Sequence, residues 1–100
     1  MKELTPKQVE KKLENNDDML ELIDVREEEE VAQGKIPHIT HIPLEQIPEK
    51  AEKLDKSKQY IMVCRSGRRS ERAAAYLQKQ GFDVANMVGG MLEWRGEIMN

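Results

Sequence analysis

The single cysteine of this 100-residue chain lies in an arginine-rich stretch, where a thiol can act as a nucleophile. Cys64 opens the run CRSGRRSER, which holds four arginines and one glutamate although the whole chain has a formal net charge of -3. Nearby positive charge stabilises a thiolate and lowers the thiol pKa below its free value of about 8.5. The alternative is a buried structural cysteine beside a solvated helix face. We favour a reactive thiol, because the run also places Gly67 in the middle of a loop.

The sequence on either side of Cys64 predicts that the thiol lies between a strand and a helix. Residues 60–63, YIMV, form an apolar run typical of a buried strand. Residues 70–80, SERAAAYLQKQ, favour a helix with one face formed by Ala73, Tyr76, Leu77 and Gln80. No capping box follows Ser70, so the N–H groups at the helix start lack a side-chain acceptor. Unpaired N–H groups at a helix start bind anions. Ligands also bind beyond the carboxyl ends of parallel strands, where Cys64 is expected to lie. We therefore expect an anion site at this helix start.

The remaining sequence predicts an alternation of short helices and strands. Thr5 and Pro6 are typical of a helix start. Helices are expected over residues 5–14, 27–33, 45–54 and 91–100, and further strands over residues 19–25, 39–42 and 84–88. This alternation predicts a single α/β domain over residues 1–100, with a central parallel sheet of about five short strands flanked by helices.

Composition and charge limit the partners that the chain can have. Hydrophobic residues make up 38% and charged residues 35%, as in a soluble globular protein. The acidic balance argues against nucleic-acid binding, and no apolar run approaches the ~20 residues that cross a membrane. The N-terminus lacks the features of a secretory signal, so we expect a cytoplasmic protein. One cysteine and two histidines do not supply an ordinary structural zinc site, and we expect no metal and no cofactor.

The run from Cys64 to Ser70 resembles the active loop of the rhodanese-like sulfurtransferases, C-x-x-G-x-R followed by Ser or Thr. Four other stretches match family motifs in the same order: Asp24-Val25-Arg26-Glu27, Gly34-Lys35-Ile36-Pro37, Ile42-Pro43-Leu44, and Gly89-Gly90-Met91 with Trp94. The similarity covers nearly the whole chain and implies a single rhodanese-like domain of the thiosulfate sulfurtransferase type. In place of the family's His-Ile-Pro-Gly-Ala run, this chain has His38 and Ile39 where two small residues are usual, which leaves donor or partner preference open.

The resemblance implies a sulfur-transfer reaction centred on Cys64. Cys64 would take a sulfane sulfur from thiosulfate or a related small anionic donor, hold it as a persulfide, and pass it to cyanide or to a thiol such as a thioredoxin-like acceptor. The substrate-binding residues would be Arg65, Ser66, Gly67, Arg68 and Arg69. Their backbone N–H groups would hold the outer sulfur, and Arg65 and Arg69 would attract the donor. The alternative is a persulfide carrier that a partner protein loads, with little turnover on thiosulfate.

The length of the loop argues against a phosphatase of the same fold. Cysteine-dependent phosphatases have five residues between the cysteine and an arginine, whereas here Ser70 stands at that position and Arg69 comes one residue early. The shorter loop suits one sulfur atom better than a phosphate. An inactive interaction domain is also disfavoured, because Cys64 and its loop are present. Two other pairs are expected to be mainly structural: Asp24 with Arg26, and His38 with His41.

Overall fold

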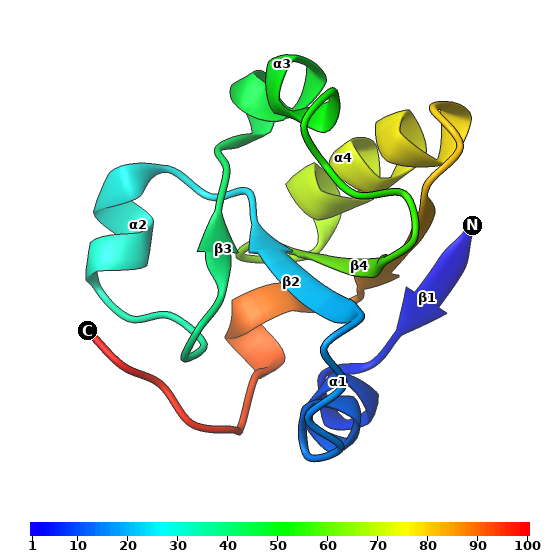
Figure 1. Ribbon diagram of the computed structural model, residues 1–100. Coiled ribbons are helices and arrows are strands. Elements are labelled where there is room, and N and C mark those ends of the chain that lie inside the picture. Colours follow the sequence, from blue (N-terminus) through cyan, green and yellow to red (C-terminus); the bar gives the residue numbers. More distant parts are fainter.

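Five parallel strands form one sheet through the middle of the molecule, and the computed structural model describes all 100 residues (Figure 1). The strands are β1 (Lys2–Leu4), β2 (Leu20–Asp24), β3 (Thr40–His41), β4 (Gln59–Val63) and β5 (Asp83–Met87). Their order across the sheet is β1-β5-β4-β2-β3, and every neighbouring pair is parallel. The predicted fold class is confirmed. Because β4 is the central strand, Cys64 follows it at the middle of the carboxyl edge of the sheet.

Helices cover both faces of this sheet (Figure 1). The α-helices are α1 (Pro6–Leu13), α2 (Glu28–Ala32), α3 (Ile47–Ala51) and α4 (Arg68–Lys79), and the 3-10 turns are η1 (Leu44–Gln46) and η2 (Gly90–Glu93). α1 begins as predicted: the Gln8 N–H donates to the Thr5 hydroxyl, the Thr5 N–H donates to the Gln8 side chain, and Pro6 is the first helical residue. None of the helices has the length and apolar character needed to cross a membrane.

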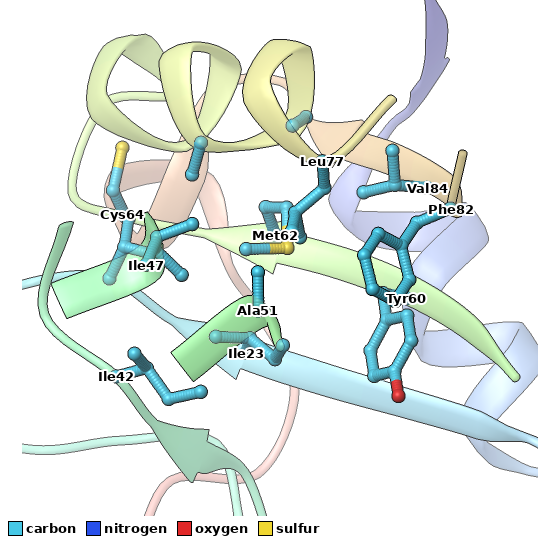
Figure 2. Close-up of a cluster of buried hydrophobic side chains, with 13 residues drawn as sticks. Ile23, Ile42, Ile47, Ala51, Tyr60, Met62, Cys64, Leu77, Phe82 and Val84 are labelled. Carbon is cyan, nitrogen blue, oxygen red and sulfur yellow. The ribbon is translucent and has the colours of Figure 1, made fainter. Parts of the chain in front are cut away.

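The alternation of side chains along β4 determines which way Cys64 faces. Tyr60 and Met62 belong to the same buried cluster as Cys64, and this cluster packs against α3 and α4 (Figure 2). Ile61 and Val63 instead join the cluster on the face covered by α1 and η2. Successive residues of a strand point to opposite faces of the sheet, so the pattern continues through the end of β4. Cys64 therefore faces the helix that begins just after it.

The structure corrects several boundaries at the ends of elements. β1 was not predicted, because it has only three residues and its Lys2 and Glu3 are exposed at the edge of the sheet. In place of the helix predicted over residues 45–54, the structure has the 3-10 turn η1 followed by the short α-helix α3, which ends at Ala51. The helix predicted over residues 91–100 is only the 3-10 turn η2. The chain beyond η2 is irregular, and Met99 pairs with Lys35 through backbone hydrogen bonds of 2.8 and 2.9 Å.

The start of α4 also differs from the prediction. The helix begins at Arg68, two residues earlier than expected, and Gly67 occupies the N-cap position with a φ of 100°. This φ lies in the left-handed region that glycine adopts without steric strain. Gly67 has no side chain that could cap the helix, so the first N–H groups of α4 are available to another acceptor.

Candidate active site

The loop after β4 and the first turn of α4 direct three hydrogen-bond donors at the sulfur of Cys64. The Gly67 N–H donates to Sγ at 3.1 Å, the Ser70 N–H at 3.3 Å and the Ser70 hydroxyl at 3.2 Å. The Cys64 side chain is buried, and Figure 2 shows its sulfur pointing away from Ile47 and Met62. These donors, together with the positive end of the α4 dipole, can stabilise negative charge on the sulfur.

Ser70 thus has a role that its place in the sequence did not reveal. It was expected to mark the start of the helix, but it lies within the first turn, and both its N–H and its hydroxyl face Cys64. Ser70 is completely buried, so its hydroxyl must find a partner inside the protein. Of the N–H groups over residues 65–69, that of Gly67 donates to Cys64 Sγ, and the set of donors to this atom also includes Ser70.

Opposing effects determine the pKa of the Cys64 thiol. Burial raises the pKa, because the thiolate loses contact with water. Hydrogen bonds from the Ser70 hydroxyl and from the backbone N–H groups of Ser70, Gly67 and Ser66 lower it. The hydrogen bonds outweigh burial, and the pKa lies below its ordinary value. A larger fraction of Cys64 is therefore thiolate near neutral pH than for a free cysteine.

Replacing Ser70 with alanine tests the contribution of the hydroxyl. The Ser70→Ala variant loses a donor that lowers the pKa of Cys64, so we expect the midpoint of thiol ionisation to move to higher pH. The measurement is the rate of alkylation by iodoacetamide as a function of pH. Ser57→Ala removes a hydroxyl that is exposed and bonded only within its own turn, and it should leave the midpoint unchanged. An unchanged midpoint in Ser70→Ala would contradict the role given to this hydroxyl.

The structure separates the arginines of the loop into two groups. Arg69 is held by α2: its Nη1 donates to Glu30 Oε1 at 2.6 Å and its Nη2 to Glu30 Oε2 at 2.8 Å. Arg65 and Arg68 are exposed and take part in none of the four ion pairs of the molecule. Of the two arginines expected to attract the donor, Arg65 has a free guanidinium and Arg69 is paired with Glu30.

The ion pair between Glu30 and Arg69 should make stability depend on pH. The hydrogen bonds from Arg69 lower the pKa of Glu30 from its ordinary value of 4.5 to about 2. Because the pKa of Glu30 is lower in the folded protein, the ionised carboxylate contributes its full stabilisation above pH 4.5. This stabilisation is lost as the pH falls to about 2 and the carboxylate becomes protonated.

Replacing Glu30 with glutamine isolates this contribution. Both partners are partly exposed, so we expect Glu30→Gln to lower the free energy of unfolding by on the order of 1 kcal/mol at neutral pH. The difference between the two proteins should shrink as the pH falls through the same interval, because the wild-type carboxylate becomes protonated. Urea denaturation at a series of pH values measures it. A difference that stays constant down to the lowest pH would contradict this assignment.

Residues of β5 and η2 donate hydrogen bonds to backbone carbonyls of the loop. Sequence patterns did not identify these residues as part of the site. The buried Asn86 side chain donates from Nδ2 to the Gly67 carbonyl at 3.1 Å. The Met91 N–H donates to the Cys64 carbonyl at 2.8 Å, and the Leu92 N–H donates to the Arg65 carbonyl at 3.0 Å. The double glycine after β5 indicated a turn, but nothing local showed that the turn packs against Cys64.

Asp24 and Arg26 form a structural ion pair, as expected. Arg26 Nη2 donates to Asp24 Oδ2 at 2.8 Å and to the Gly34 carbonyl at 2.9 Å, and both side chains are buried. The pair connects the end of β2 to the chain beyond α2. His41 lies beside it, with its Nε2 2.7 Å from the Arg26 carbonyl, whereas His38 is exposed at another place on the surface. The two histidines therefore do not form a relay with Cys64.

Comparisons with known proteins bear on the family of the chain. The sequence model of the rhodanese-like domain family matches residues 5–97. A protein of Bacillus subtilis with the name "Putative sulfurtransferase YtwF" is 50% identical over 97 residues, which cover 97% of this chain and 93% of YtwF. GlpE of Pseudomonas savastanoi, named as a thiosulfate sulfurtransferase, is 39% identical over 75 residues, which cover 74% of this chain and 71% of GlpE.

A solved structure shows the same architecture. The rhodanese-like domain protein from Staphylococcus aureus superposes with a TM-score of 0.88 at 36% identity, over 97% of this chain and 94% of that one. The names of the relatives support sulfur transfer as the general chemistry of the protein. The family motifs around Cys64 and the matched range lead to the same conclusion: the chain belongs to the rhodanese-like domain family.

Proposed function

We propose that the protein is a thiosulfate sulfurtransferase in which Cys64 carries the sulfur as a persulfide. The observation that supports this proposal is the set of three donors aimed at Cys64 Sγ from Gly67 and Ser70. Sulfur transfer needs a thiolate nucleophile and then an environment that stabilises an anionic persulfide. The same end of α4 can serve both steps, because its N–H groups are free of a capping side chain.

In the first step the Cys64 thiolate attacks the outer sulfur of thiosulfate. A new S–S bond forms at Sγ, the S–S bond of the donor breaks, and sulfite leaves with the bonding electron pair. Cys64 then holds one additional sulfur, which carries negative charge. N–H groups of residues 65–69 stabilise that charge, and the exposed Arg65 and Arg68 attract the anionic donor to the loop.

In the second step an acceptor removes the outer sulfur. Cyanide attacks this sulfur, the S–S bond to Sγ breaks, and the products are thiocyanate and the regenerated Cys64 thiolate. A thiol acceptor reacts in the same way and leaves as a persulfide. Because the chain has one cysteine, no internal disulfide can release the sulfur, and the acceptor must be a separate molecule.

Steady-state kinetics with thiosulfate and cyanide test the proposal. We expect the protein to form thiocyanate over many turnovers, with saturation in thiosulfate. Protein alkylated at Cys64 with iodoacetamide is the control and should be inactive. If the unmodified protein forms no thiocyanate although its thiol reacts with iodoacetamide, thiosulfate is not its donor, and the carrier that a partner protein loads becomes the better explanation.

A further inference from the structure

A second candidate site lies at the opposite end of the molecule from Cys64. It is a groove of about 790 Å³ between α1 with the turn that follows it, residues 36–39, and the C-terminal segment that holds Trp94 and Glu97. Figure 1 shows α1 and the C-terminal segment together at the lower end of the molecule. Residues 36–39 precede β3 and the turn after α1 precedes β2, whereas Cys64 follows β4. In a parallel sheet these are opposite edges, so the groove is separate from the sulfur-transfer site.

The floor of the groove is apolar. Leu22, Ile36 and Trp94 are buried members of the cluster on the α1 face, and they form part of the lining. Leu13 and Leu20 are only half-buried, so some apolar surface of the groove remains in contact with water. The buried part of the floor keeps its shape without a ligand, and the apolar surface that is still exposed at Leu13 and Leu20 gains free energy when a partner covers it.

The rim of the groove is strongly acidic. Six carboxylates and one lysine, Lys12, line it; the carboxylates are Glu10, Glu14, Asp17, Asp18, Glu21 and Glu97. Of these only Glu21 takes part in an ion pair, with Lys58 at 3.3 Å. The arginine-rich loop lies at the other edge of the sheet, so its guanidinium groups do not neutralise the carboxylates of the rim. The groove therefore repels nucleic acids and anionic lipids and attracts cations.

His38 adds an unusual feature to this rim. Its φ is 64°, in the left-handed region, where a residue with a side chain is disfavoured. This chain holds an exposed imidazole at the groove in a strained backbone conformation, and such strain is found preferentially at functional sites.

We propose that the groove docks a basic segment of a partner protein, with apolar side chains on the floor and lysine or arginine side chains facing the carboxylates. A small cation would leave the apolar floor uncovered, whereas a peptide segment can satisfy both the floor and the rim. Protein interfaces commonly combine an apolar centre with a charged rim of complementary sign. Because the groove and Cys64 lie at opposite edges, the docked partner leaves the sulfur-transfer loop open.

Trp94 provides a direct test, because it is the only tryptophan of the chain and it lines the groove. The probe is a short synthetic peptide of lysine and leucine without aromatic residues. We expect a saturable change in Trp94 fluorescence that weakens as salt is added. A control peptide with serine in place of every leucine should bind at least about tenfold more weakly, because it cannot cover the floor.

Two charge-matched variants locate the binding. Glu14→Lys with Glu97→Lys reverses two exposed rim charges, and Glu49→Lys with Glu52→Lys makes the same change in net charge at α3. We expect the rim variant to bind the lysine–leucine peptide about tenfold more weakly, and the α3 variant to stay within about twofold of the wild type.

Three results would overturn the proposal. Equal binding of the serine peptide would mean that the rim attracts any cation and the floor has no part. Equal weakening in both variants would assign the effect to net charge alone. Concentration-dependent self-association, measured by analytical ultracentrifugation and abolished in the rim variant, would make a second copy of this chain the occupant.

Discussion

Replacing Cys64 with serine is expected to abolish sulfur transfer and to leave the protein folded. A serine hydroxyl is not ionised near neutral pH and cannot hold sulfur as a persulfide, so thiocyanate formation should fall by more than about 10³-fold, to the uncatalysed background. The serine oxygen can accept the hydrogen bonds that Gly67 and Ser70 give to Sγ. The free energy of unfolding should therefore stay within about 1 kcal/mol of the wild-type value.

Two measurements separate loss of chemistry from loss of structure. Urea denaturation compares the stability of the two proteins, and thiocyanate formation compares their activity under the same conditions. Transfer that persists in a folded Cys64→Ser protein would show that another group carries the sulfur. Unfolding of the variant would instead show that the thiol itself is needed for the fold.

Gly90 to alanine is the change with the largest expected effect on the architecture of the loop. Gly90 has a φ of 58°, and a Cβ at this position would lie 2.5 Å from the carbonyl oxygen of Cys64. The backbone strain and the overlap should together lower the free energy of unfolding by about 3 kcal/mol. The loop must also move away from η2, so the N–H donors around Cys64 lose their alignment and activity should fall about 100-fold.

Gly81, which follows the C-terminal end of α4, offers a matched control. It also has a positive φ, 94°, but the nearest atom to a Cβ there is the flexible end of Lys56, at 3.6 Å. Gly81→Ala therefore adds strain without overlap, and it should cost about 1 kcal/mol and leave transfer unchanged. Denaturation curves and thiocyanate kinetics for both variants measure the comparison. Equal effects of the two substitutions would contradict the close packing of Gly90 beneath Cys64.

The parts of the fold that follow from local patterns were predicted from the sequence. The apolar run YIMV and the alanine-rich stretch after it correspond to β4 and α4, because burial and helix propensity act on neighbouring residues. β1 was missed because its three residues have little apolar character and depend on pairing with β5, far along the chain. The start of α4 was misplaced because Gly67 caps the helix through its backbone conformation, while Ser70 resembles a cap but faces Cys64.

The candidate site was predicted only where its residues are contiguous. Cys64 and its loop form one run, so charge and spacing were sufficient to single them out. The groups that hold the loop come from α2, β5 and η2: Glu30 binds Arg69, Asn86 binds the Gly67 carbonyl, and Gly90 lies against Cys64. The run of four glutamates from Glu27 gave no reason to choose Glu30, since only the docking of α2 beside α4 brings this carboxylate to Arg69. Such contacts depend on the tertiary fold.

Intact-protein mass spectrometry after incubation with thiosulfate, and again after addition of cyanide, is the most direct test of persulfide formation at Cys64. We expect the wild-type protein to gain the mass of one sulfur atom, cyanide to remove it with formation of thiocyanate, and Cys64→Ser to gain nothing. A gain of one sulfur in the Cys64→Ser protein, or no gain in a wild-type protein whose thiol still reacts with iodoacetamide, would contradict this expectation.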